Sequence, residues 1–159
     1  MTCPYSGGMK RRVGVAQALL GDPRLLIVDE PTSGLDPEER VRLRNLLADM
    51  AGRRTIILST HIVEDVSQTC TDLAVLHQGR ILFRGAPRAL IERVRGHVWT
   101  LTLLPGERPD GGLTVVSTLR LDEQVQYRVV GPEAQHPAAE PATPNLEDGY
   151  LWLMKEGVP

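Results

Sequence analysis

No long apolar stretch occurs among the 159 residues, and the longest uninterrupted aliphatic run covers only residues 25–28. A helix needs about 20 apolar residues to span a bilayer. We therefore expect any association with a membrane to come through a partner. Cysteine is also scarce, because only Cys3 and Cys70 occur, far apart and without metal-ligand spacing. This pair predicts ordinary thiols in a reducing compartment and excludes a disulfide framework.

A concentrated basic tract is missing as well, so nothing in the sequence indicates a surface that captures a nucleic-acid backbone. The formal net charge is −2. Residues 1–96 carry 14 basic and 11 acidic side chains, whereas the remainder carries 4 and 9, so the balance changes from +3 to −5. Apolar residues make up 42% and charged residues 24% of the chain, as in ordinary globular proteins. We expect a folded chain whose two parts have different roles.

Helices and strands alternate in the prediction for residues 1–95, which form the first expected domain. A first helix is expected over residues 7–20, with apolar side chains at helical spacing at Met9, Val13, Ala16 and Leu20. Two aliphatic runs, 25–28 and 55–58, are typical of strands buried on both faces of a parallel sheet. The other expected elements are a helix opened by Asp36 and Pro37, a helix over 63–69, a hairpin of strands 73–76 and 81–83, and a helix over 87–94.

The pattern changes after residue 95. Residues 96–131 predict a β-rich accessory segment, with strands over 98–104, 113–119 and 124–130. Residues 132–144 are rich in proline and alanine, which predicts a linker. Residues 145–159 predict a final helix that Asn145 caps, with apolar side chains at Leu146, Tyr150, Leu153 and Met154.

Two consecutive carboxylates, Asp29 and Glu30, end the first predicted strand, and His61 stands just past the second. The carboxyl ends of parallel strands meet at one edge of a sheet, where ligands collect in open α/β folds. An acid there can hold Mg²⁺ while its neighbour faces a reacting water, and an imidazole can donate to a phosphoryl oxygen. Each residue also has an ordinary explanation, because core strands often end in a solvated acid and loop histidines often lie at the surface.

Two glycine-containing segments complete the set of candidate residues. Ser6, Gly7 and Gly8 open the first helix, where backbone N–H groups and the helix dipole favour an anion. The alternative is that Ser6 is an ordinary helix cap. Residues 33–36 predict a tight turn, and Asp36 at its end is likewise explained by helix capping alone. Taken singly, each segment fits a purely structural role.

Taken in order, these segments resemble the C-terminal half of an ATP-binding cassette (ABC) ATPase, over about residues 4–90. The resemblance implies an α/β fold, with part of a P-loop NTPase sheet, flanking helices and a small β-rich C-terminal extension. It implies that Asp29 is the magnesium ligand, Glu30 the catalytic carboxylate and His61 the catalytic switch histidine. It assigns the nucleotide-binding signature to Ser6, Gly7, Gly8 and Met9, and the D-loop at a dimer interface to Ser33, Gly34, Leu35 and Asp36.

The same resemblance implies ATP hydrolysis coupled to transport across a membrane, with ATP and Mg²⁺ as cofactors. The expected partners are a second ATPase subunit, identical or different, and a membrane-spanning permease, with no nucleic acid. The expected location is cytoplasmic, peripheral on the cytoplasmic face of the cell membrane. Tyr5 and Met9 depart from the usual Leu-Ser-Gly-Gly-Gln signature, and this variant is similar to the ATPases of bacterial drug and lipid exporters.

The family's phosphate-binding loop is missing, because Gly-x-x-x-x-Gly-Lys-Ser/Thr occurs nowhere in the sequence. That loop cradles the phosphates of ATP, so we expect a truncated export ATPase that is inactive alone. Two alternatives stay open: a non-catalytic partner that donates its signature to a complete cassette or regulates it, and an inactive gene fragment. Without the strands that precede these segments in the family, we also expect an unpaired sheet edge and an uncovered apolar face.

Overall fold

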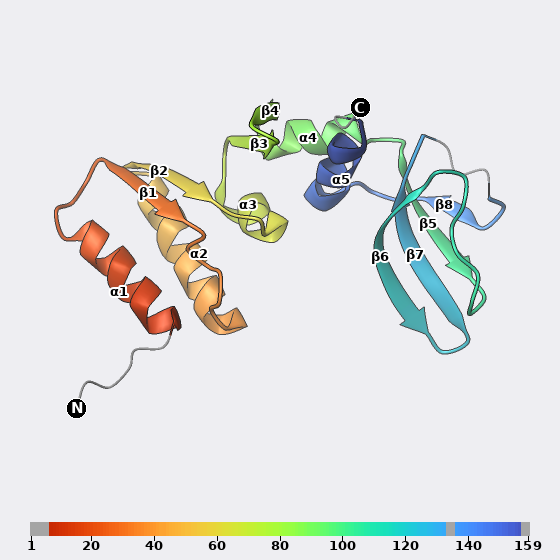
Figure 1. Ribbon diagram of the computed structural model, residues 1–159, viewed down its shortest axis with the longest axis horizontal. Helices are drawn as coiled ribbons and strands as arrows, with labels where there is room; N and C mark the ends of the chain where they lie inside the picture. Colours follow the sequence, from red (N-terminus) through yellow and green to blue (C-terminus); the bar gives the residue numbers. More distant parts are fainter. Residues whose placement is uncertain (1–6, 133–135, 157–159) are drawn as a thin grey trace. The chain divides into compact units, whose positions relative to one another are not determined.

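The computed structural model describes residues 7–132 and 136–156, without the side chain of Arg11. The chain divides into two compact units, which we call the N-terminal unit (Met1–Cys70) and the C-terminal unit (Thr71–Pro159) (Figure 1). The architecture is mixed α/β, as predicted. The sequence-based domain boundaries after residues 95, 131 and 144 stay predictions. None of the helices in the described ranges is long and apolar enough to cross a membrane.

The N-terminal unit is a strand-helix-strand-helix arrangement preceded by a helix, and each predicted element is present. Strands β1 and β2 are parallel, with residue pairs running from Leu25–Thr55 to Asp29–Ser59. Their carboxyl ends therefore lie side by side. The elements are α1 (Gly7–Leu19), β1 (Leu25–Asp29), α2 (Pro37–Ala51), β2 (Thr55–Ser59) and α3 (Val63–Thr69).

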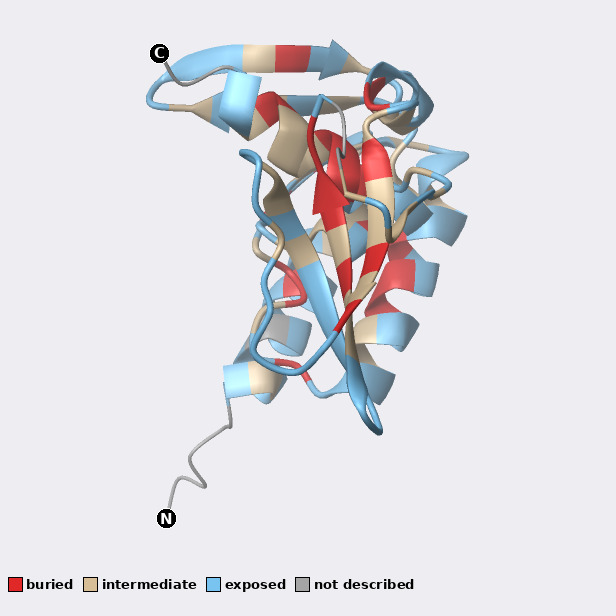
Figure 2. Ribbon diagram, turned by 90° about the vertical axis from the view of Figure 1, so that its right-hand side faces the viewer, coloured by how far each residue is buried: buried red, intermediate tan, exposed pale blue. Residues whose placement is uncertain are grey.

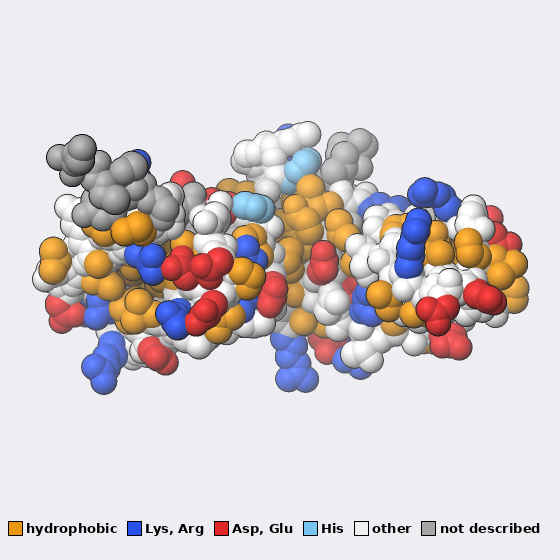
Figure 3. Space-filling view, turned by 90° about the horizontal axis from the view of Figure 1, so that it is seen from below, with side chains coloured by type: hydrophobic (Ala, Val, Ile, Leu, Met, Phe, Trp, Pro, Cys, Tyr) orange, Lys and Arg blue, Asp and Glu red, His pale blue; other side chains and the backbone are white. Residues whose placement is uncertain are grey.

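One face of the two-stranded sheet is buried and the other is open. The buried core of this unit consists of Val15, Leu26, Val28, Leu35, Leu43 and Leu47. The alternate strand residues Leu25, Ile27 and Ile57 are 50%, 67% and 53% exposed, and Figure 3 shows hydrophobic side chains among charged ones on the surface of this unit. The prediction of strands buried on both faces is wrong here, because the helices of the unit pack on one face. The uncovered apolar face was predicted and is confirmed.

The buried side of α1 also differs from the prediction. Met9, Val13 and Leu20 are 41%, 55% and 85% exposed, whereas Val15 and Leu19 belong to the core. Side chains two residues apart on an α-helix are rotated by about 200° around the helix axis, so they point to nearly opposite sides. Burial of Val15 therefore turns Val13 toward solvent.

The C-terminal unit begins with an antiparallel hairpin and a short helix, followed by a four-stranded antiparallel sheet of order β6-β7-β5-β8 and a final helix. Strand β8 lies within residues 132–144, where the sequence predicted no strand; it pairs at the edge of the sheet, a place that tolerates proline. The elements are β3 (Leu73–His77), β4 (Arg80–Gly85), α4 (Pro87–Arg93), β5 (Val98–Leu103), β6 (Thr114–Leu121), β7 (Gln124–Val130), β8 (Ala139–Pro141) and α5 (Leu146–Glu156).

Helix α5 is held by an ion pair with a buried carboxylate and by close packing. Arg128 of β7 donates from Nε and Nη2 to the two carboxylate oxygens of Asp148, at 2.8 and 2.6 Å. This hydrogen bond and the charge of Asp148 raise the pKa of Arg128. At Gly149, an added Cβ would lie only 2.8 Å from the carbonyl oxygen of Leu90 in α4. Figure 2 shows the buried segments of the adjoining sheet in red.

Candidate functional site

The carboxyl ends of β1 and β2 bring the predicted Asp29, Glu30 and His61 to one edge of the sheet. Nδ1 of His61 lies 2.8 Å from Oε1 of Glu30, although 31 positions separate the two residues. Because a carboxylate only accepts hydrogen bonds, Nδ1 of His61 is the donor. The His61 side chain is 72% exposed and that of Glu30 is 30% exposed. The pair is therefore joined and open to a ligand from solvent.

Glu30 adopts an uncommon backbone conformation that the sequence did not reveal. Its φ is +46°, in the left-handed region that non-glycine residues seldom enter. Its N–H donates to the carbonyl oxygen and to Oγ of Ser59, both at 3.1 Å, and its own carbonyl oxygen accepts from the N–H of Ser33 at 3.2 Å. Strained residues held by several contacts cluster at active sites. The backbone thus supports Glu30 as a functional residue.

Asp29 and Ser59 form the second half of the site. They are paired residues of β1 and β2, and the Ser59 hydroxyl donates to Oδ1 of Asp29. The donor set is therefore made of oxygen atoms, which Mg²⁺ prefers, and Mg²⁺ often takes only one or two carboxylates and completes its shell with phosphates and waters. Over the described ranges, no group of three or more His, Cys, Asp or Glu side chains could hold a metal. The residues fit a magnesium ion that arrives with a phosphate ligand.

The predicted turn over residues 33–36 joins β1 to α2. Gly34 has φ +73°, which glycine adopts without strain, and the N–H of Leu35 donates to the carbonyl oxygen of Thr32 at 3.2 Å. Asp36 caps α2, because its Oδ1 accepts from the N–H of Glu39 at 2.8 Å. The capping role of Asp36 is thus observed. Its role at a dimer interface stays a prediction.

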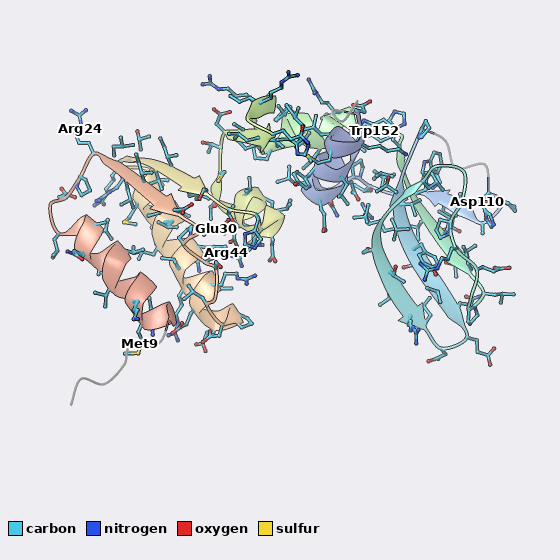
Figure 4. The ribbon with its side chains drawn as sticks, in the orientation of Figure 1. Met9, Arg24, Glu30, Arg44, Asp110 and Trp152 are labelled. Carbon is cyan, nitrogen blue, oxygen red and sulfur yellow. The ribbon has the colours of Figure 1, made fainter. Side chains whose placement is uncertain are left out.

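The predicted signature residues lie at the start of α1, apart from Ser6, which falls outside the described residues. An added Cβ would meet no atom within 4 Å at Gly7, whereas at Gly8 it would lie 3.1 Å from Cδ2 of Leu35. Met9 is 41% exposed and is labelled at the lower end of α1 in Figure 4. The structure therefore brings Gly8 against Leu35 of the predicted D-loop.

Three residues near the site were not singled out from the sequence: Thr32, Arg44 and Asp65. All three are buried, and they contact one another as described below. Arg44 lies next to Leu43 among the buried residues of α2. A charged residue beside the predicted apolar side of this helix was the one sequence signal that could have indicated the three buried residues. The positions of Thr32 after Pro31 and of Asp65 in a short helix gave no indication in the sequence that these residues are buried.

Comparison with known proteins supports the interpretation of this region. Residues 5–64 match the model of a family described as "AAA domain, putative AbiEii toxin, Type IV TA system". This range includes α1, both parallel strands and His61. It therefore contains every residue proposed here for the site.

Proteins named Nod factor export ATP-binding protein I are similar to a larger part of the chain. The protein from Rhizobium meliloti is 40% identical over 165 aligned residues, which cover 93% of this chain and 48% of that protein. The chain belongs to the ATP-binding cassette family. Two other proteins of the same name, from Rhizobium johnstonii and Burkholderia pseudomallei, are 53% and 50% identical over 57% and 55% of the chain. The aligned residues cover 30% and 29% of those proteins.

This cassette chain thus spans about half the length of the first of these relatives. Within it, the candidate site residues form two groups. Glu30 and His61 meet at the sheet edge beside Asp29, and Gly8 meets Leu35 at the start of α1. Figure 4 shows Met9 well apart from Glu30 within the N-terminal unit. The first turn of α1 and the sheet edge with Glu30 are therefore separate parts of the N-terminal unit.

Proposed function

We propose that this chain is part of the ATP-hydrolysing subunit of an export transporter, in which Glu30 acts on the attacking water and His61 contacts the transferred phosphoryl group. The observation that carries the proposal is the 2.8 Å contact between Glu30 and His61 at the carboxyl edge of two parallel strands. The likeness to proteins named for Nod factor export supports the transport role.

The proposed chemistry is in-line attack of water on the γ-phosphoryl group of ATP. A carboxylate positioned near the γ-phosphate orients the nucleophile, and donors around the transferred oxygens stabilise the developing charge. In this proposal Glu30 takes the first role. A protonated imidazole donates from both nitrogens, so His61 can bond Glu30 through Nδ1 and a phosphoryl oxygen through Nε2.

Asp29 would hold Mg²⁺ in this proposal, with its carboxylate oriented by the Ser59 hydroxyl. When bound, the ion neutralises negative charge on the phosphates. The predicted signature residues Ser6, Gly7, Gly8 and Met9 would bind the nucleotide held by a second ATPase subunit, and residues 33–36 would line that subunit interface. A membrane-spanning permease would complete the transporter, with this chain peripheral on the cytoplasmic face of the cell membrane.

The 159-residue chain alone is proposed to be inactive as an ATPase. Its sequence has no Gly-x-x-x-x-Gly-Lys-Ser/Thr, the loop whose backbone N–H groups and lysine cradle the phosphates. Glu30 without a bound phosphate has no reaction to promote. The activity therefore belongs to an assembly in which another segment or subunit holds the nucleotide.

A chimera tests this function directly. The part of the Rhizobium meliloti relative that precedes the matching region is fused to this chain, and Mg²⁺-dependent ATP hydrolysis is measured before and after Glu30→Gln. We expect hydrolysis by the parent chimera and a fall of at least about 100-fold in kcat in the variant, the size of effect typical for a lost catalytic base. Binding of ATP should persist, because the carboxylate acts on water.

Glu38→Gln is the matched control, because Glu38 forms an exposed ion pair with Arg42 at the surface of α2. It makes the same carboxylate-to-amide change and should leave kcat unaltered. A chimera that binds ATP but never hydrolyses it would favour the non-catalytic alternative. Equal kcat for Glu30→Gln and the parent would remove Glu30 from the proposed role.

A further inference from the structure

A buried polar contact links the segment after β1 to helix α3. The Thr32 hydroxyl donates to Oδ2 of Asp65 at 2.5 Å, and the two residues are 33 positions apart. Thr32 is 2% exposed and Asp65 is 3% exposed. Such a contact between distant segments, away from solvent, restricts both of them.

Arg44 of α2 completes this cluster. Its Nη1 lies 3.4 Å from Oδ1 of Asp65 and 3.3 Å from Oε1 of Glu64. The Arg44 side chain is 8% exposed, whereas that of Glu64 is 61% exposed. A buried charge is costly unless it is paired and hydrogen-bonded. Arg44 and Thr32 together satisfy both carboxylate oxygens of Asp65, so the cluster depends on all three positions.

The cluster stands next to the candidate catalytic pair. Thr32 is two residues after Glu30, and Asp65 is four residues after His61. Local hydrogen bonds continue the connection on each side: the carbonyl oxygen of Thr32 accepts from the N–H of Leu35, and the N–H of Asp65 donates to the carbonyl oxygen of Ile62.

We propose that Asp65 is a positioning residue, which through Thr32 couples the Glu30 segment and the turn over residues 33–36 to the His61 segment. Asp65 does not act on substrate. It fixes the two segments relative to one another, so that His61 meets Glu30 and the turn cannot move independently of α3. The catalytic meaning of this coupling rests on the proposed function, but the coupling itself does not.

Amide hydrogen exchange of the 159-residue chain, followed by NMR without nucleotide, tests the coupling. Two variants weaken the contact from opposite sides: Thr32→Val removes the hydroxyl, and Asp65→Asn removes the charge and replaces one of the two acceptor oxygens by an NH2 donor. We expect Thr32→Val to accelerate exchange about tenfold at the N–H of Ile62, which donates to Oγ1 of Thr60 at 3.0 Å. Asp65→Asn should do the same at Ser33 and Leu35. The amides of β1 and β2 should keep their wild-type rates.

In each variant the exchange rate is expected to rise in the segment opposite the mutation. This reciprocal effect distinguishes a positioning role from a general contribution to stability, because a general loss of stability would also accelerate exchange of the amides of β1 and β2. Thr32→Ser keeps the hydroxyl and should restore the wild-type rate at Ile62. Glu38→Gln, a carboxylate-to-amide change in an exposed pair, should change none of these rates. The ring nitrogen shifts of His61 give a second readout, because loss of coupling should reduce the fraction protonated at Nδ1.

Unchanged exchange at Ile62 in Thr32→Val, or acceleration confined to the mutated segment in both variants, would overturn the proposal. If Asp65→Asn fails to fold, the comparison of Thr32→Val with Thr32→Ser still decides the question at Ile62. A chain that shows the reciprocal effect while the chimera has no ATPase activity would keep the coupling and reject the proposed function. The two ideas therefore fail separately.

Discussion

Gly8 of α1 lies against Leu35, so closely that a Cβ on Gly8 would stand 3.1 Å from Cδ2 of Leu35. The same Cβ would stand 3.4 Å from Oε2 of Glu39, whose Oε1 is paired with Arg12 of α1 at 2.6 Å. The first turn of α1 is thus packed on the segment between β1 and α2. A glycine assigned to nucleotide binding by resemblance also has a packing role in its own chain.

Gly8→Ala and Gly14→Ala should therefore have different effects on stability. Both glycines are in α1, but a Cβ on Gly14 would meet no atom within 4 Å. Alanine in a helix interior is favoured over glycine by about 1 kcal/mol, so Gly14→Ala should raise the free energy of unfolding by roughly that amount. Gly8→Ala should show no gain or a loss, because buried Leu35 must move. Amide exchange of β1 and β2 measures both free energies, and equal gains would contradict the contact.

The tautomer of His61 is a second testable consequence of the site. Because Nδ1 faces the Glu30 carboxylate at 2.8 Å, neutral His61 should carry its proton on Nδ1, since the hydrogen bond made by one ring nitrogen fixes the tautomer. Glu30→Ala removes the acceptor and should shift the proton toward Nε2. Long-range ¹H–¹⁵N NMR distinguishes the two forms. The same tautomer in both proteins would mean that the contact does not persist in solution.

Nucleotide affinity gives a third prediction. The sequence has no phosphate-binding loop of the Gly-x-x-x-x-Gly-Lys-Ser/Thr type, so the chain alone should bind ATP with Kd no tighter than about 1 mM, which corresponds to about −4 kcal/mol. Isothermal titration calorimetry with Mg²⁺ measures this. Micromolar binding would show that other residues of this chain hold the phosphates.

Sequence reasoning succeeded where a local pattern determines the structure. Two aliphatic runs separated by a capped helix predicted adjacent parallel strands, and that topology alone placed Glu30 near His61. The tight turn with Gly34 followed from its residue types. These features depend on short-range chemistry and on the general rule for the carboxyl ends of parallel strands.

The features that were missed depend on three-dimensional contacts. Val13 and Val15 are both apolar and nearly opposite on α1, so periodicity alone could not decide which one is buried. Charged residues are rarely buried unless paired, and nothing in the sequence indicated that Arg44 and Asp65 meet. The left-handed backbone of Glu30 is likewise accompanied by two hydrogen bonds that its N–H donates to Ser59 of the neighbouring strand.

The ion pair between Arg128 and Asp148 should be a large contribution to the stability of the C-terminal unit. Asp148 is fully buried, and its carboxylate also accepts from the N–H of Asn145 at 2.7 Å. Arg128→Met leaves this charge without its cation, which should lower the free energy of unfolding by about 3 kcal/mol. Trp99 and Trp152 are the two tryptophans and both lie in this unit, so their fluorescence in urea follows its unfolding.

Arg95→Met is the control for Arg128→Met, because Arg95 lies in the same unit and its pair with Glu92 is 70% and 44% exposed, and exposed pairs contribute at most about 1 kcal/mol. The pH dependence has a definite sign. Because the pKa of Arg128 is raised on folding, its stabilisation is complete below the unfolded pKa and is lost only as pH rises through the folded pKa, in strong alkali. The difference between Arg128→Met and wild type should therefore show no contribution from Arg128 titration between pH 6 and pH 9. An effect of Arg128→Met no larger than that of Arg95→Met would mean that Asp148 is solvated in solution and that α5 is not held by this pair.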